Sequence, residues 1–96
     1  MIESFSDPAT ADLFHNRPTS RVRRFPADII PAVLRKLVML DSARSIQDLR
    51  QPPSNRLEAM KGKLRGKYSI RVNDQWRILF EWSDNAARQV SLTDYH

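Results

Sequence analysis

Two stretches in the last third of this 96-residue chain alternate regularly between apolar and polar positions. In 68–72 and again in 76–82, every second side chain is a large apolar one, with mostly polar side chains between them. A period of two is the pattern of a β-strand with one buried face, and a helix does not sustain it. The chain therefore has to build a sheet, and the two stretches predict adjacent strands of a hairpin.

The register of this hairpin follows from the same pattern. Both apolar sets must point to one face if a single layer of helices is to cover them, because a slip of one residue reverses every side chain. Val72 must then pair with Trp76, which leaves 73–75 as a three-residue loop, an allowed hairpin length. This register sets Arg71 directly opposite Arg77 on the other face.

Two arginines opposite each other repel and destabilise a sheet. We therefore expect an anion between or above Arg71 and Arg77. It is either a carboxylate of the chain, Glu58 or Glu81, or a bound phosphate, and the residues alone leave both alternatives open.

Helical signals dominate the first half of the chain. Asp7 followed by Pro8 is a helix start, and we expect a short helix to about His15. Apolar residues at helical spacing predict the main helix from about Asp28, with Pro31 inside its first turn. The remaining expectations are a strand at 2–5, a basic loop at 16–24 and a helical turn at 45–49. A further strand is expected after the hairpin, at 88–92, and it ends before Asp94.

These elements predict one α+β domain over residues 1–96, in the order βααβββ, with helices packed on one face of an antiparallel-rich sheet. The chain has no cysteine, which is typical of a reducing compartment, and no signal-peptide or membrane-spanning pattern, so we expect a cytoplasmic protein without a membrane partner. Two histidines without cysteines offer no usual metal-ligand spacing, and we expect neither metal nor cofactor.

The net charge of +5 is concentrated in two blocks, 17–36 and 54–82. Such a surface attracts polyanions, above all nucleic acid, although a solubilising surface explains the charge equally well. The chain ends in Asp94, Tyr95 and His96. These side chains can carry or hold protons in a reaction, whereas a frayed terminus needs none of them.

RNA can be cleaved without metal when its 2′-OH attacks the adjacent phosphate, given a base, an acid and cations. His96 can give or take a proton near neutral pH, Tyr95 can stack on a base or donate a hydrogen bond, and Glu58 or Asp94 can accept a proton. The available cations are Arg77, Arg71, Lys61, Lys63, Arg65 and Lys67. The alternative for the residues of 61–67 is a solvated basic loop.

The runs Pro-Pro-Ser-Asn-Arg-Leu-Glu-Ala-Met-Lys-Gly at 52–62 and Tyr-Ser-Ile-Arg-Val-Asn-Asp-Gln-Trp-Arg-Ile at 68–78, with the terminal Asp-Tyr-His, resemble the HigB toxin group of the RelE superfamily. The resemblance implies a RelE-like toxin of a type II toxin–antitoxin pair that cleaves mRNA in the A site of the 70S ribosome. It implies a HigA-type helix-turn-helix antitoxin as partner, and binding of operator DNA only through that antitoxin.

Carried over residue by residue, the resemblance makes Arg77 the transition-state cation and Asp94, Tyr95 and His96 the C-terminal catalytic group. Arg65 would help to hold the phosphate backbone. Some members have a catalytic histidine where this chain has Glu58, so we assign Glu58 as base and His96 as acid. The competing hypothesis is a non-catalytic basic module that docks RNA or a protein partner.

Overall fold

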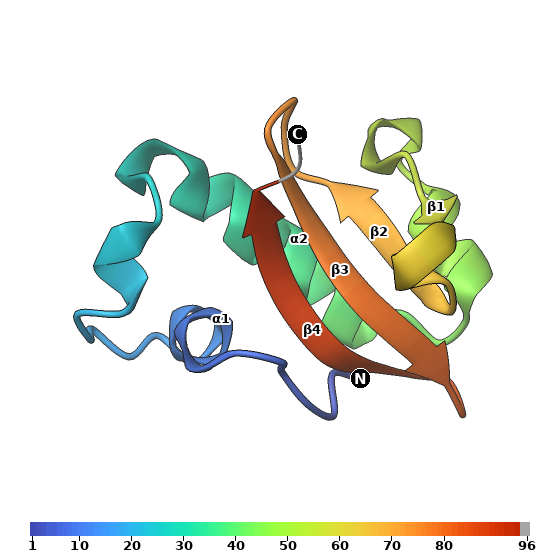
Figure 1. Ribbon diagram of the computed structural model, residues 1–96, viewed down its shortest axis with the longest axis horizontal. Helices are drawn as coiled ribbons and strands as arrows, with labels where there is room; N and C mark the ends of the chain where they lie inside the picture. Colours follow the sequence, from blue (N-terminus) through green and yellow to red (C-terminus); the bar gives the residue numbers. More distant parts are fainter. Residues whose placement is uncertain (95–96) are drawn as a thin grey trace.

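The computed structural model describes residues 1–94, in which two helices and a four-stranded antiparallel sheet share one core (Figure 1). The long helix α2 crosses one face of the sheet, and the short helix α1 packs beside it against the last strand. The other face carries the polar side chains of the central strands, and we call it the open face. The predicted fold class is confirmed.

Both helices begin where the sequence indicates. Helix α1 spans Pro8–Phe14, and the Asp7 carboxylate accepts a hydrogen bond from the Thr10 backbone N–H at 2.7 Å, which satisfies an otherwise unpaired donor of the first turn. Helix α2 spans Ile30–Ser42 after a 3₁₀ turn, Ala27–Ile29, so that a proline falls in its first turn as expected. Further 3₁₀ turns lie at Val22–Arg24, Ile46–Arg50 (η3), Pro53–Asn55 (η4) and Gly62–Leu64 (η5).

The sheet has the order β1-β2-β3-β4, with β1 at Glu58–Ala59, β2 at Lys67–Arg71, β3 at Trp76–Ser83 and β4 at Ala86–Asp94. The predicted hairpin register is confirmed, because Arg71 pairs with Arg77 and the Val72 N–H donates to the Trp76 carbonyl at 2.9 Å. The Asn73 side chain accepts backbone hydrogen bonds within the hairpin loop and closes it.

The core lies between the sheet and α2. Val33, Leu37 and Leu40 of α2 are fully buried, and Ile78 and Phe80 of β3 are buried against them. Burial of these large apolar side chains is the main favourable contribution to folding. One layer of helices therefore covers the apolar side chains of both β2 and β3, as the sequence predicts.

Three strand predictions need correction. The first expected strand consists only of two parallel bridges, Ile2 to Ala87 and Phe5 to Val90, rather than an extended ladder. The two-residue strand β1 was not predicted, since a segment so short has no measurable period. Strand β4 continues to Asp94, which is therefore part of the strand and not beyond its end.

Candidate functional site

Arg77 is held in place on the open face by side chains of β1 and β2. Its Nη1 donates to the Ser69 Oγ at 2.9 Å and lies 3.4 Å from the Glu58 Oε2. The pairing of β1 with β2 sets Glu58 opposite Ser69, and the next strand brings Arg77 diagonally across from both. Only 17% of the Arg77 side chain is exposed, against 53% for Glu58, so a fixed cation lies beside an accessible carboxylate.

Arg71 lies opposite Arg77 and has a different partner. Its Nη2 forms an ion pair with Asp74 of the hairpin loop. The Arg71 hydrogen bond holds the pKa of the Asp74 carboxyl below its usual range. The repulsion between the two arginines is thus offset by chain carboxylates, Glu58 on one side and Asp74 on the other, of which only Glu58 was among the expected candidates.

Three of the predicted RNA-binding cations lie in the segment between β1 and β2. Lys61, Lys63 and Arg65 are exposed. Lys63 lies within the turn η5 and the other two flank it, and the turn lies in front of β2 in Figure 1. A hollow of about 340 Å³ opens beside this turn, and its lining includes Glu58 and Lys61 together with Ala59, Met60 and Leu64. The predicted base and a predicted cation therefore share one cavity.

Lys67 is not part of this group. It pairs with Glu81 at the other end of β2, with 3.6 Å between its Nζ and the Glu81 Oε2. Arg71 is the fourth residue after it along the strand, roughly 13 Å away at the usual rise. The structure therefore brings together Glu58, Arg71 and Arg77 but sets Lys67 apart.

Asp94 lies at the end of β4, beside the hairpin loop. It pairs with Trp76, and its Oδ2 accepts a hydrogen bond from the Gln75 side chain at 3.2 Å. The same register sets Thr93, rather than Asp94, directly opposite Arg77. Tyr95 and His96 lie outside the described residues, so their roles stay predictions.

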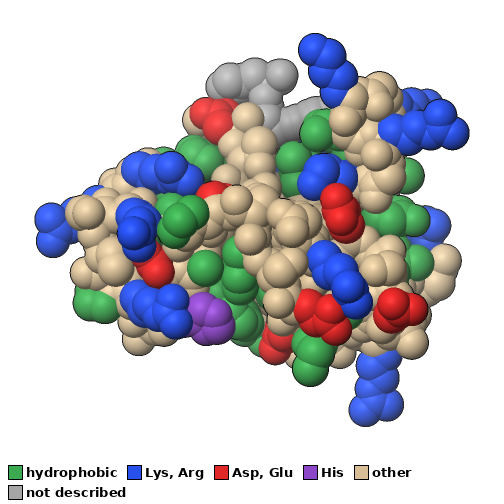
Figure 2. Space-filling view, turned by 60° about the horizontal axis from the view of Figure 1, so that its bottom comes forward, with side chains coloured by type: hydrophobic (Ala, Val, Ile, Leu, Met, Phe, Trp, Pro, Cys, Tyr) green, Lys and Arg blue, Asp and Glu red, His purple; other side chains and the backbone are tan. Residues whose placement is uncertain are grey.

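Residues 17–24, in the first basic block, form a separate structure that we call the arginine loop. Asp12 of α1, whose side chain is 5% exposed, lies 3.1 Å from Arg21 and 3.5 Å from Arg17, and it accepts a hydrogen bond from Thr19 at 2.8 Å. The Thr19 hydrogen bond, followed by Arg21, holds the Asp12 pKa below its usual range despite burial. Figure 2 shows Lys and Arg side chains gathered on both sides of one face of the molecule.

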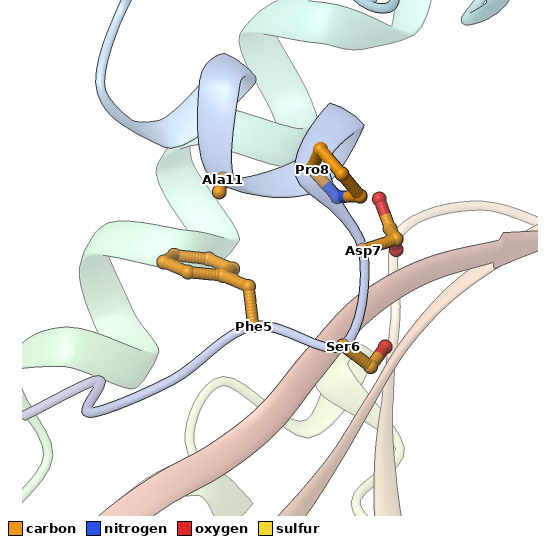
Figure 3. A pocket seen from close by; sticks show the side chains of 5 residues that line it. All are labelled: Phe5, Ser6, Asp7, Pro8 and Ala11. Carbon is orange, nitrogen blue, oxygen red and sulfur yellow. The ribbon is translucent and has the colours of Figure 1, made fainter.

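A second hollow lies where the N-terminal segment meets α1 and is shown in Figure 3. It is shallow, has a volume of about 350 Å³, and its lining includes no predicted site residue; the five lining residues are Phe5, Ser6, Asp7, Pro8 and Ala11. Within residues 1–94, no helix is long and apolar enough to cross a membrane. Over the same range, no three His, Asp or Glu side chains lie close enough together to hold a metal ion.

Ser69 is the site residue that the sequence reasoning missed. Its side chain is fully buried, and its hydroxyl accepts the hydrogen bond that orients Arg77. The signal was available, because the predicted register makes Ser69 a diagonal neighbour of Arg77 on the same face. The alternating pattern alone marks Ser69 only as a polar position, and its role becomes clear once its neighbour Arg77 is considered.

Known proteins support a specific family. Residues 3–96 match the family described as the RelE-like toxin of the type II toxin–antitoxin system HigB. Toxin HigB-1 of Vibrio cholerae serotype O1 is 49% identical over 72 residues, which are 75% of this chain and 76% of that protein. Endoribonuclease HigB of Proteus vulgaris is 32% identical over 96 residues, all of both chains.

Solved structures show the same fold at lower identity. The YoeB–YefM complex from Staphylococcus aureus contains a chain that aligns with a TM-score of 0.61 at 18% identity, over 100% of this chain and 98% of that one. A YafQ variant from E. coli aligns with a TM-score of 0.61 at 11% identity, over 98% and 93%. These similarities concern the fold alone, whereas the family match covers nearly every residue. The chain belongs to the HigB-like family, the RelE-like toxins of type II toxin–antitoxin systems.

Proposed function

We propose that this toxin is a ribosome-dependent endoribonuclease that cleaves mRNA without a metal ion. The observation that carries the proposal is Arg77, a cation fixed by Ser69 and set beside the accessible Glu58 carboxylate at the edge of a hollow. The relative from Proteus vulgaris, described as an endoribonuclease, supports the same activity. A preorganised cation next to a proton acceptor suits phosphodiester cleavage by an internal nucleophile.

The reaction breaks one bond and forms one. Glu58 takes the proton of the RNA 2′-OH as this oxygen attacks the adjacent phosphorus, and the bond from phosphorus to the 5′-oxygen breaks. His96 gives a proton to that leaving oxygen, while Arg77 stabilises the charge that develops on the phosphoryl oxygens. The products are a 2′,3′-cyclic phosphate and a free 5′-OH, and hydrolysis of the cycle leaves a 3′-phosphate.

The remaining predicted residues serve binding and positioning. Tyr95 stacks on a base beside the cleaved bond, and Asp94, at the end of β4, holds a cationic neighbour in place. Cations of the open face and of the neighbouring loop hold the backbone phosphates: Arg71, Lys61, Lys63, Arg65 and, farther along β2, Lys67. The mRNA would be presented in the A site of the 70S ribosome, which places the protein in the cytoplasm.

The proposed inhibitor is a HigA-type helix-turn-helix antitoxin. The matching family is described as toxins of a type II toxin–antitoxin system, and the Staphylococcus aureus fold relative was solved as a complex of YoeB with YefM. Operator DNA would be bound through the antitoxin, since the cations of the open face and the neighbouring loop are proposed to bind RNA.

Purified toxin incubated with ribosomes programmed with a defined message tests the proposal. The unaltered protein should yield fragments ending in 2′,3′-cyclic phosphate or 3′-phosphate. On ribosomes that have been chemically fixed beforehand, it should yield the same fragments with EDTA and without it. Arg77→Ala and a deletion of residues 95–96 should each abolish cleavage while the protein remains folded by circular dichroism. A message left intact by the unaltered toxin would favour the non-catalytic binding module instead.

A further inference from the structure

The cations of the open face are followed by another arginine at the edge of the sheet. The turn η4, which ends at Asn55, contacts β2, and the exposed Arg56 directly follows it before the short strand β1 begins. We call Arg56, Arg71 and Arg77 the arginine row. Two strand spacings of about 4.8 Å separate β1 from β3, so the row spans roughly 10 Å, enough for more than one phosphate of an RNA strand.

The backbone around Arg56 is built rather than loose. Asn55, which precedes it, is fully buried and donates to the Leu49 and Gln51 carbonyls at 3.2 Å each. Lys36 of α2 donates to the Asn55 Oδ1 from the other side. Arg56 itself has a left-handed backbone (φ 44°), a conformation that costs a non-glycine residue energy and is retained where the surroundings impose it.

The electrostatics agree with this geometry. Burial, followed by Arg35 and Arg71, holds the Lys36 pKa below its usual range, so Lys36 lies within the field of β2. Arg71 and, more weakly, Arg56 lower the pKa of Asp74. Arg71 and Arg56 thus share a single carboxylate, that of Asp74, whose side chain is 99% exposed. An excess of positive charge at one exposed edge is a binding position for further anionic groups.

We infer that Arg56 is a phosphate-binding residue, and that the arginine row holds the RNA strand over the phosphates next to the cleaved bond. This rests on the proposed function for the identity of the strand. Asp74 has the opposite effect, because its carboxylate neutralises Arg71 in the free protein and repels the incoming phosphate. The row therefore extends the binding surface from Arg77 to the outer edge at η4.

Binding of a single-stranded oligonucleotide with 2′-O-methyl groups isolates this role, because that RNA cannot be cleaved. Fluorescence anisotropy at several salt concentrations should give an affinity roughly three- to tenfold lower for Arg56→Gln, with a salt slope smaller by about 0.7. Asp74→Asn should bind more tightly than the unaltered protein. Arg44→Gln is the matched control, because Arg44 is exposed and follows the end of α2 away from the hairpin loop (Figure 1), and it should change neither quantity.

The outcomes separate the two proposals. An unaltered affinity and slope for Arg56→Gln, or no binding of the oligonucleotide by the unaltered protein, overturns the arginine row even if Arg77→Ala loses cleavage. Weaker binding by Arg56→Gln supports the row even if the cleavage assay refutes the catalytic assignment. If Arg56→Gln weakens capture of the antitoxin and leaves RNA binding intact, the edge is a protein interface and the inference is wrong.

Discussion

Arginines gather in two regions of this toxin, and the carboxylates that they meet differ in exposure. In the arginine loop, Arg17 and Arg21 converge on Asp12, whose side chain is 5% exposed. On the open face, Arg77 and Arg71 meet Glu58 and Asp74, whose side chains are 53% and 99% exposed. Both regions are rich in arginine, but the carboxylate is buried in the arginine loop and the carboxylates are exposed on the open face.

The difference teaches how to separate structural from functional cations. A buried carboxylate cannot be replaced by a ligand, so the arginines around Asp12 are committed to fixing the loop. An exposed carboxylate can itself meet a substrate, and a bound phosphate can replace it beside its arginine. Charge counted along the sequence cannot make this distinction, because it depends on which carboxylate the fold buries.

The largest contrast is expected from the same substitution in both regions. Arg77→Ala should lower the cleavage rate on programmed ribosomes by on the order of 10²–10³-fold, since it removes the cation proposed to stabilise the transition state. Its melting temperature should remain close to that of the unaltered protein, because the side chain lies outside the core.

Arg21→Ala is the matched partner of that experiment. It should leave cleavage within about twofold and lower the melting temperature by a few degrees, as Asp12 keeps Thr19 and Arg17 but loses its shortest ion pair. Equal losses of cleavage in the two variants, at equal stability, would erase the distinction between the regions.

A smaller effect is expected at the carboxylate of the open face. Glu58→Gln keeps the size and polarity of the side chain but cannot accept the 2′-OH proton, so the rate should fall by on the order of 100-fold. A variant with full activity would leave Glu58 as a structural partner of Arg77 only.

Ser69→Ala should act through Arg77. Loss of the hydroxyl removes one hydrogen bond that orients the guanidinium, and we expect a rate reduction of about three- to tenfold, because Glu58 still holds it. Single-turnover measurements at saturating ribosome should show the effect on the rate rather than on binding. A change confined to KM would assign Ser69 to binding instead.

The fold was predictable where the signal is local. The period of two, the three-residue loop and the helix start at Asp7 each depend on a few neighbouring residues, and each is confirmed. Strand β1 was not predictable, because two residues show no period and their pairing depends on partners nine and eleven residues away along the chain.

The site was predictable in part for the same reason. The register alone placed Arg77 opposite Arg71, and the expected carboxylate Glu58 does lie beside Arg77. The burial of Ser69 and the anchoring of Arg56 by Asn55 are set by tertiary contacts that leave no pattern in the sequence. The pairing of Arg71 with Asp74 is local, but the alternation of the strands says nothing about a side chain of the hairpin loop. Residue types alone marked the tail as a candidate, and the family resemblance made it the C-terminal catalytic group.

The smallest predicted effect concerns the acid stability that Asp12 gives the arginine loop. The folded pKa of Asp12 lies below its ordinary value of 3.8, mainly because of the Thr19 hydrogen bond. Folded protein therefore binds this proton less tightly than the unfolded chain does. The resulting stabilisation is fully present above about pH 4 and is lost as the pH falls through the lower folded value.

Between pH 5 and pH 8, Asp12→Asn should accordingly have a melting temperature on the order of 5 °C below that of the unaltered protein. Cleavage per folded molecule should be unchanged. Below pH 4 the difference between the variant and the unaltered protein should narrow, because a protonated Asp12 resembles asparagine. Asp48 and Asp74, whose pKa values are also lowered, titrate in both proteins and cancel in the comparison. A difference that stays constant down to pH 2 would mean that the side chain stabilises the loop by its shape and hydrogen bonds rather than by its charge. The buried carboxylate would then no longer distinguish the arginine loop from the open face electrostatically.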